Sequence, residues 1–155
     1  MRLLHYSKDP LPANLCDMLQ DVGPKPRGLW VSVEGEDDWK SWCIRERFWL
    51  VNLTTETEIK LLPDAKIIHL SCAGDIDDFG DKYTAVEYPY NGFPGAFINW
   101  PQIATEYDGI IIAPYVWSRR LASRCFWYYG WDCASGCIWN IGAIESMKTL
   151  NRSTK

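Results

Sequence analysis

The segment Phe97–Ala113 reads FINWPQIATEYDGIIIA and joins two different hydrophobic patterns. Its first part, Phe97–Tyr107, has the pattern of a helix. Its second part, Gly109–Ala113, is a nearly continuous apolar run, which is typical of a strand buried on both faces. The segment therefore predicts a helix that leads into a strand in the interior of the domain.

Strand patterns outnumber helix patterns in the rest of the chain. Short apolar runs between polar turns predict strands over Arg2–Ser7, Gly28–Val33, Phe48–Leu53, Thr57–Leu62, Lys66–Ser71 and Gly136–Asn140. Helical patterns predict helices over Leu11–Val22, Glu36–Glu46 and Ala73–Tyr83 and a helical turn over Ile141–Met147, whereas Trp117–Trp127 is ambiguous. Turn signals lie in Asn91–Gly95. Because strands and helices do not alternate regularly, we expect an α+β fold.

Length and composition fit one globular domain. The chain has 155 residues, of which 47% are hydrophobic and 23% charged, so it needs neither disulfides nor metal to form a core. We place the domain at 1–150 and a polar tail at 151–155. Nine tryptophans and eight tyrosines are unusual. We expect most of these rings in the core, while interfaces and stacking platforms are the alternative uses.

The charge pattern argues against broad binding to nucleic acid. Net charge is −4 and no long basic run is present. Arg119, Arg120 and Arg124 form a small cluster that either touches phosphates or lies on a solvated helix face. The N-terminus has no apolar signal-peptide core, and no apolar run is long enough to span a membrane. We therefore expect a cytoplasmic protein with no membrane partner and with its six cysteines as thiols.

The motifs do not indicate a metal site or a phosphate loop. Cys125, Cys133 and Cys137 are close in sequence to Asp132, but their spacing lacks the two paired ligand groups of a structural zinc site. No Gly-rich phosphate loop is present. We therefore expect no metal, and we interpret these cysteines as small buried thiols.

His5 is the most informative residue near the N-terminus. It lies in the apolar stretch Leu3–Ser7, which a polar break follows. A histidine at the end of a first strand either hydrogen-bonds a ligand hydroxyl or is a satisfied histidine of the core or sheet edge. The motifs in the rest of the chain favour the first alternative.

Five blocks of sequence carry a family resemblance. Leu4–Ser7 reads LHYS and Gly28–Ser32 reads GLWVS. Three longer blocks follow: Leu62–Leu70 (LPDAKIIHL), Ile98–Ile112 (INWPQIATEYDGIII) and Cys137–Ile144 (CIWNIGAI). In this order they resemble the ADP-ribosyltransferase superfamily of bacteria and phages. Its motifs are L-Y-H-G-T/S, G-I-Y-F-S/T, a following strand, W-x-x-I-A-x-x-Y-D-G-I and V-V-F-D-P-S-Q-I.

This resemblance implies a split β-sandwich of two small sheets with flanking helices and with NAD+ bound as substrate in the cleft between them. It implies that His5 hydrogen-bonds the ribose next to nicotinamide, and that Trp30, where Tyr is usual, helps to hold that ribose and ring. Trp39 or Trp42 would stack on the nicotinamide. The implied NAD+-binding residues are His5, Tyr6, Ser7, Gly28, Trp30, Ser32, Trp39 and Trp42.

The third motif departs from the family pattern. The family usually has a Glu just before the closing strand, and Ser135 occupies that position here. Serine supplies no negative charge, so Asp132 or Glu145 is the candidate replacement. The segment Trp127–Cys137 matches no family motif and either shapes the cleft and recognises the target or forms an aromatic lid on the core. The implied catalytic residues are His5, Trp30, Asp132 and Ser135.

Three functions are compatible with the resemblance. The first is an NAD+-dependent transferase that modifies a macromolecular acceptor, with a protein favoured over a nucleic acid. The second, favoured by the missing Glu, is a catalytically inactive interaction module that binds a host protein, as a phage or mobile-element protein would. The third is a related enzyme that acts on RNA or nucleotide ends, which the arginine cluster favours and the acidic balance disfavours.

Overall fold

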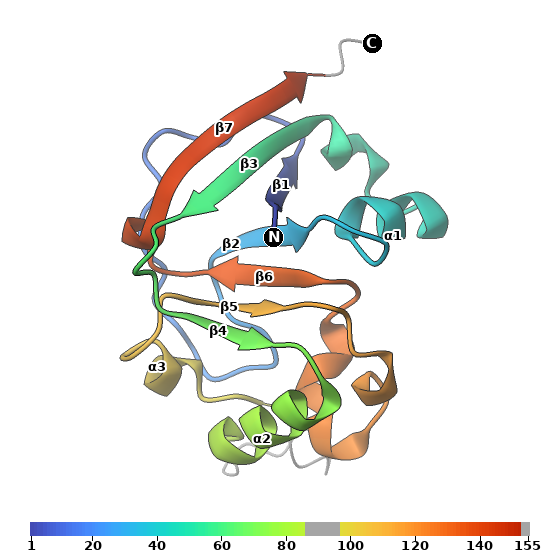
Figure 1. The fold of residues 1–155 in the computed structure, drawn as a ribbon, viewed down its shortest axis with the longest axis vertical. Helices are drawn as coiled ribbons and strands as arrows, with labels where there is room; N and C mark the ends of the chain where they lie inside the picture. The colour runs from blue at the N-terminus through green and yellow to red at the C-terminus, as the bar shows by residue number, and fades with distance from the viewer. Residues whose placement is uncertain (86–96, 153–155) are drawn as a thin grey trace.

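One mixed sheet contains all seven strands of the described residues. The computed structural model describes residues 1–85 and 97–152 (Figure 1). The spatial order of the strands is β4-β5-β6-β2-β1-β3-β7. The α+β class is confirmed, whereas the expected pair of small sheets is wrong, because β1 pairs with β2 and joins all the strands. The strands are β1 (Leu3–Ser7), β2 (Leu29–Val33), β3 (Thr55–Leu61), β4 (Ile67–Leu70), β5 (Gly109–Ile112), β6 (Ser135–Ile138) and β7 (Ile144–Arg152).

The joint between β1 and β2 is short. These antiparallel strands pair only at Leu3↔Val33 and Leu4↔Ser32, whereas β1 pairs with β3 over all five of its residues. In Figure 1, β3 and β7 run steeply across the view, while β6, β5 and β4 run nearly horizontally. The sheet therefore changes direction at this joint, and β1 and β2 separate beyond it.

Carboxylate caps fix the starts of the two longer helices. α1 (Trp39–Glu46) begins after Asp38, whose carboxylate accepts a hydrogen bond from the Ser41 N–H at 2.7 Å. α2 (Ala73–Tyr83) has the bounds that the sequence predicts. At its start, the Asp75 carboxylate accepts a hydrogen bond from the N–H of the N-cap residue Cys72 at 3.2 Å. Such caps satisfy backbone donors that helix starts leave unpaired.

Aromatic rings form much of the core beside α2 and the 3-10 segment η3 (Ser123–Gly130). The Phe79 ring lies 5.0 Å from the Trp127 ring and 5.8 Å from the Trp100 ring, between centroids. The Trp139 ring lies 6.2 Å from that of Trp100. All four side chains are buried, and we call them the core aromatic cluster. For these rings the expected core location is confirmed.

Two segments expected to be helical are mostly irregular. Leu11–Val22 contains no helix, because its backbone is tied to a distant segment: the Met18 N–H donates to the Trp139 carbonyl at 3.1 Å. Within Phe97–Tyr107, the helix is the single turn α3 (Trp100–Ile103). The Thr105 hydroxyl donates to the Gln102 carbonyl at 2.7 Å, a side-chain bond of the kind that competes with helix continuation.

Two other segments also differ from expectation. Phe48–Leu53 is not a strand but leads into the 3-10 helix η1 (Leu50–Leu53), because Arg47 and Trp49 are left-handed, with φ of 53° and 57°. Ile141–Met147 begins with the expected helical turn, the 3-10 helix η4 (Ile141–Ala143), but continues as β7, which pairs with β3. Pairing with a long neighbouring strand overrides the local pattern there.

Three further segments for which the sequence led to an expectation remain. The ambiguous stretch Trp117–Trp127 forms the 3-10 helix η2 (Trp117–Arg119) and most of η3. Residues 151–152 of the expected tail belong to β7, and residues 153–155 lie outside the described residues. The expected turn at Asn91–Gly95 also lies outside them.

Candidate functional site

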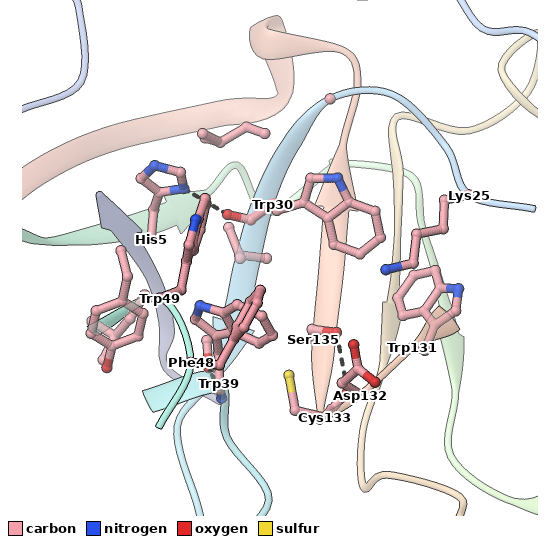
Figure 2. Close-up of a pocket in the computed structure, with 16 residues that line it drawn as sticks. His5, Lys25, Trp30, Trp39, Phe48, Trp49, Trp131, Asp132, Cys133 and Ser135 are labelled. Atoms are coloured by element: carbon pink, nitrogen blue, oxygen red, sulfur yellow. Dashed lines mark hydrogen bonds between the residues drawn. The ribbon is translucent and has the colours of Figure 1, made fainter. Parts of the chain in front are cut away.

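A cleft of about 550 Å³ opens where β1 and β2 separate (Figure 2). Its size lies in the range of pockets that hold small organic ligands. Strands β1, β2 and β6 form its floor, and α1 with the segment after it closes one side. The lining residues are Leu4, His5, Tyr6, Lys25, Gly28, Leu29, Trp30, Val31, Ser32, Trp39, Phe48, Trp49, Trp131, Asp132, Cys133 and Ser135.

His5 bridges the gap between the diverging strands. Its Nδ1 lies 2.8 Å from the Trp30 carbonyl oxygen (Figure 2). A carbonyl oxygen only accepts hydrogen bonds, so Nδ1 carries the proton and donates it. Burial lowers the pKa of His5 more than this hydrogen bond raises it, so the ring is neutral at neutral pH. Nε2 is then a hydrogen-bond acceptor at the edge of the cleft.

Aromatic rings form the walls of the cleft. The Trp30 ring meets the Trp131 ring edge to face, with centroids 4.9 Å apart. On the other side, the Trp49 ring lies 6.1 Å from the Trp39 ring in the same kind of contact. Phe48 is 48% exposed and Trp49 is 52% exposed, so this wall is open to solvent. Such walls suit a flat ligand.

Trp39 and Trp42 do not have equivalent places. Their rings are stacked with centroids 5.0 Å apart, but Trp39 lines the cleft and Trp42 does not. Trp39 is therefore the ring of the two that is open to the cleft, and Trp42 stacks against it without lining the cleft. The sequence left open which of the two rings faces the expected ligand site, and in the structure Trp39 lines the cleft.

The two serines of the site have structural hydrogen bonds. Ser32 on β2 lies opposite Ser135 on β6. The Ser32 hydroxyl accepts a hydrogen bond from the Trp39 N–H at 2.9 Å, so it holds the start of α1 beside the cleft. The Ser135 hydroxyl donates to the Cys133 carbonyl at 3.1 Å. Both serines are buried.

Asp132 is the acidic residue among the described cleft-lining residues. Its Oδ1 accepts from Arg120 Nη2 at 3.1 Å, and Arg120 also donates to the Tyr115 hydroxyl at 3.2 Å. The alternative acid, Glu145, is on β7 and pairs with Lys60 at 2.6 Å. The structure therefore brings Asp132 to the site and leaves Glu145 in the other half of the sheet.

The other predicted NAD+-binding residues differ in their exposure to the cleft. Tyr6 lines it, and burial raises the pKa of its hydroxyl. Gly28 lines it as well, and a Cβ there would lie 2.4 Å from the Ile138 carbonyl oxygen, so the close approach of backbones requires glycine. Ser7 is not a lining residue. Its hydroxyl donates to the Asp9 carbonyl at 2.7 Å.

Several residues that line the cleft were not predicted as site residues from the sequence. They include Lys25, Phe48, Trp49 and Trp131. The segment Trp127–Cys137 could have indicated Trp131, because it was a candidate cleft wall. The structure places Trp131, Asp132, Cys133 and Ser135 of this segment on the cleft and Trp127 in the core. Lys25 lies in an irregular loop before β2, and nothing in its spacing predicts that it reaches the cleft.

Neither the thiol that lines the cleft nor the arginine cluster adds a charged group to the site. All six cysteines are free thiols, and burial raises the pKa of the cleft residue Cys133 to about 12, so it is protonated at neutral pH. Arg119 makes two hydrogen bonds of 2.8 Å to Asp77, and Arg124 pairs with Asp81 at 2.7 Å. The arginine cluster is thus neutralised by aspartates.

No family model matches the chain, and neither do any curated proteins or solved structures compared with it. In residues 1–85 and 97–152, no group of three or more metal-ligating side chains comes together. Within the same ranges, every helix is too short or too polar to cross a bilayer. Evidence on the function of the protein therefore comes from the geometry of the cleft.

Proposed function

We propose that the cleft binds NAD+ and that the protein transfers ADP-ribose from it to a protein acceptor. The observation that carries this proposal is the bond from His5 Nδ1 to the Trp30 carbonyl oxygen, 2.8 Å long, at the point where β1 and β2 separate. This bond fixes the tautomer and leaves Nε2 as an acceptor for a ribose hydroxyl. Both residues belong to the blocks that resemble the ADP-ribosyltransferase superfamily.

The aromatic walls fit the nicotinamide end of NAD+. Nicotinamide in NAD+ is a flat ring with a positive charge, and such rings bind well against aromatic faces. Trp39 and Trp49 form the wall that is open to solvent, and Trp30 belongs to the opposite wall. The volume of about 550 Å³ accommodates a large part of such a dinucleotide.

The transfer reaction assigns a role to Asp132. The bond between ribose C1′ and the nicotinamide nitrogen breaks, its electron pair stays on nicotinamide, and positive charge develops on the ribose. A nucleophile of the acceptor then forms a bond to C1′ and releases its proton to solvent. A carboxylate in the cleft stabilises the developing positive charge. Ser135 has no charge, so Asp132, held in place by Arg120, supplies it.

The surface beside the cleft favours a protein acceptor. Ile44, Leu50 and Val51 are 58%, 49% and 60% exposed and adjoin the exposed cleft residues Phe48 and Trp49. We call these five residues the apolar rim. The apolar rim combines aliphatic and aromatic side chains and contains no basic residue. Such a surface is typical of a protein interface, whereas nucleic-acid sites pair stacking rings with positive charge.

The test of the NAD+ site uses the two histidines of the chain. In His5→Asn, the amide nitrogen can still donate to the Trp30 carbonyl, but no acceptor remains in the place of Nε2. We expect this variant to lose nicotinamide release and labelling of a lysate from labelled NAD+. His69→Asn is the matched control, because His69 lies on β4 and does not line the cleft. Equal activity of His5→Asn and the wild type would exclude the proposed site.

A second function is favoured by the third motif. Ser135 stands where the family has Glu, and the charge of Asp132 is already paired with Arg120. On these grounds the alternative is a catalytically inactive module that holds NAD+ and binds a host protein through the apolar rim.

The wild type and Asp132→Asn, measured together, distinguish the two functions. For the enzyme, we expect about a hundredfold loss of nicotinamide release, since a preorganised electrostatic group contributes on this scale, with NAD+ binding nearly unchanged. For the inactive module, NAD+ raises the melting temperature of the wild type but no nicotinamide is released. A melting temperature that does not respond to NAD+, together with no turnover, would contradict both.

A further inference from the structure

We infer that Lys25 recognises a phosphate group of the ligand in the cleft. This inference rests on the proposed NAD+ site and adds a specificity-determining residue to it. Lys25 lines the cleft, and its Nζ lies 5.1 Å from the centroid of the Trp30 ring. Figure 2 shows the Lys25 ammonium and the His5 ring on opposite sides of Trp30. A ligand that reaches His5 with a ribose thus has a cation farther along the same cleft.

The charge of Lys25 has no ion-pair partner among the described residues. No carboxylate there lies within salt-bridge distance of its ammonium. The nearby acid is Asp132, which pairs with Arg120. The two nearby thiols, Cys133 and Cys137, have pKa values raised by burial and are neutral. An anion in the cleft would therefore meet a positive charge that has no direct ion-pair partner.

The ammonium end of Lys25 is partly removed from water. The residue as a whole is exposed, yet burial of its ammonium end lowers the pKa of Lys25 more than Asp132 raises it. Desolvation of a charge without a partner is unfavourable. Binding of an anionic group offsets this cost, and an electrostatic contact is stronger in such surroundings than in bulk water.

Packing holds the Lys25 side chain in this position. A Cβ on Gly130 would lie only 3.0 Å from Lys25 Cε, so the absence of a side chain at Gly130 leaves room for the lysine stem. Pro24 and Pro26 flank Lys25 in the sequence and restrict its backbone. The restricted backbone of Lys25 reduces the entropy lost when its side chain binds an anion.

Phosphate is the anion that fits this arrangement best. In NAD+ and in its mononucleotide half, a phosphate follows the ribose next to nicotinamide. Lysine binds phosphate as a point charge with three donors. A carboxylate of the acceptor is the other source of negative charge, and the experiment separates the two.

The experiment compares nicotinamide mononucleotide with nicotinamide riboside, which lacks the phosphate, by titration calorimetry. We expect the wild type to bind the mononucleotide about tenfold to a hundredfold more tightly. Lys25→Met is expected to lose this preference while its affinity for the riboside stays the same, and Lys25→Arg is expected to keep much of it. Lys66→Met is the control, because Lys66 is exposed and does not line the cleft.

The other outcomes are equally decisive. A preference for the mononucleotide that persists in Lys25→Met, or equal binding of both compounds by the wild type, would overturn the role of Lys25 and leave the NAD+ site intact. Competition by sodium acetate as strong as that by sodium phosphate at equal ionic strength would also overturn phosphate recognition. Failure of the wild type to bind NAD+ as well as both fragments would overturn the proposed function itself.

Discussion

The core aromatic cluster and the aromatic walls of the cleft use the same residue types in opposite ways. Trp100 and Trp127 of the cluster are fully buried, and their rings contact each other and the ring of Phe79. Phe48 and Trp49 at the cleft are about half exposed and flanked by backbone in the left-handed region. Burial of the rings in the core contributes to the stability of the fold, whereas an exposed ring at the cleft is available to a ligand.

Trp131 connects the two regions. Its ring contacts Trp127 of the core at 6.3 Å and Trp30 of the cleft at 4.9 Å, between centroids. It is almost completely buried although it lines the cleft. To separate effects on stability from effects on ligand binding, variants must therefore be made at residues that belong only to the core or only to the cleft.

The largest expected effect is in the core. Trp100→Ala removes a fully buried ring and the hydrogen bond that its Nε1–H donates to the Gly23 carbonyl at 3.0 Å. We expect the free energy of unfolding to fall by about 3–5 kcal/mol, measured by urea denaturation. A loss of less than about 1 kcal/mol would contradict the closed core described above.

An intermediate effect is expected at the cleft. Trp49→Ala is expected to change the free energy of unfolding by less than about 1 kcal/mol, because Trp49 is half exposed. The same variant is expected to weaken NAD+ binding about tenfold through the loss of a stacking surface. Trp117→Ala is the matched control, since Trp117 has the same 52% exposure and does not line the cleft. If Trp49→Ala destabilises the protein as much as Trp100→Ala, the two regions do not differ in the way proposed.

The smallest effect concerns His5 and pH. Burial lowers the pKa of His5 in the folded protein, so the unfolded chain binds a proton at a higher pH than the folded chain does. The contribution of His5 is then fully present above its unfolded pKa of about 6.5 and is lost as pH falls below that value toward the lower folded pKa. The slope from one such group is at most about 1.4 kcal/mol per pH unit.

Urea titrations at several pH values check this dependence. We expect His5→Asn to show a shallower loss of stability on acidification than the wild type. Identical profiles for the two proteins would show that the imidazole is not buried in the folded state.

Hydrophobic patterns predicted the parts of the fold in which local and tertiary interactions agree. β1, β5 and α2 lie where the sequence indicates them, because their apolar residues face the core. Leu11–Val22 has helical spacing but no helix, since a distant backbone group holds Met18. Phe48–Leu53 is apolar but exposed, and no pattern shows that the backbone turns left-handed at Arg47 and Trp49.

The candidate site was predictable where residues lie on paired strands. His5 and Trp30 meet because β1 and β2 are neighbours, and Ser135 lies opposite Ser32 because β6 pairs with β2. Lys25 reaches the cleft only because an irregular loop passes beside it. The two sheets expected from the sequence form a single sheet because two residue pairs join β1 to β2.

These two pairs have a consequence for how the molecule responds to an occupant. The halves of the sheet are held together there by a short ladder and by the imidazole of His5, which spans the widening gap. A ligand that donates a hydrogen bond to Nε2 of His5 would contact the same imidazole that links β1 to β2. We then expect the amide protons of β1 and β2 to exchange with deuterium more slowly when the cleft is filled than when it is empty. Ligand binding would thus reduce local opening across the whole sheet.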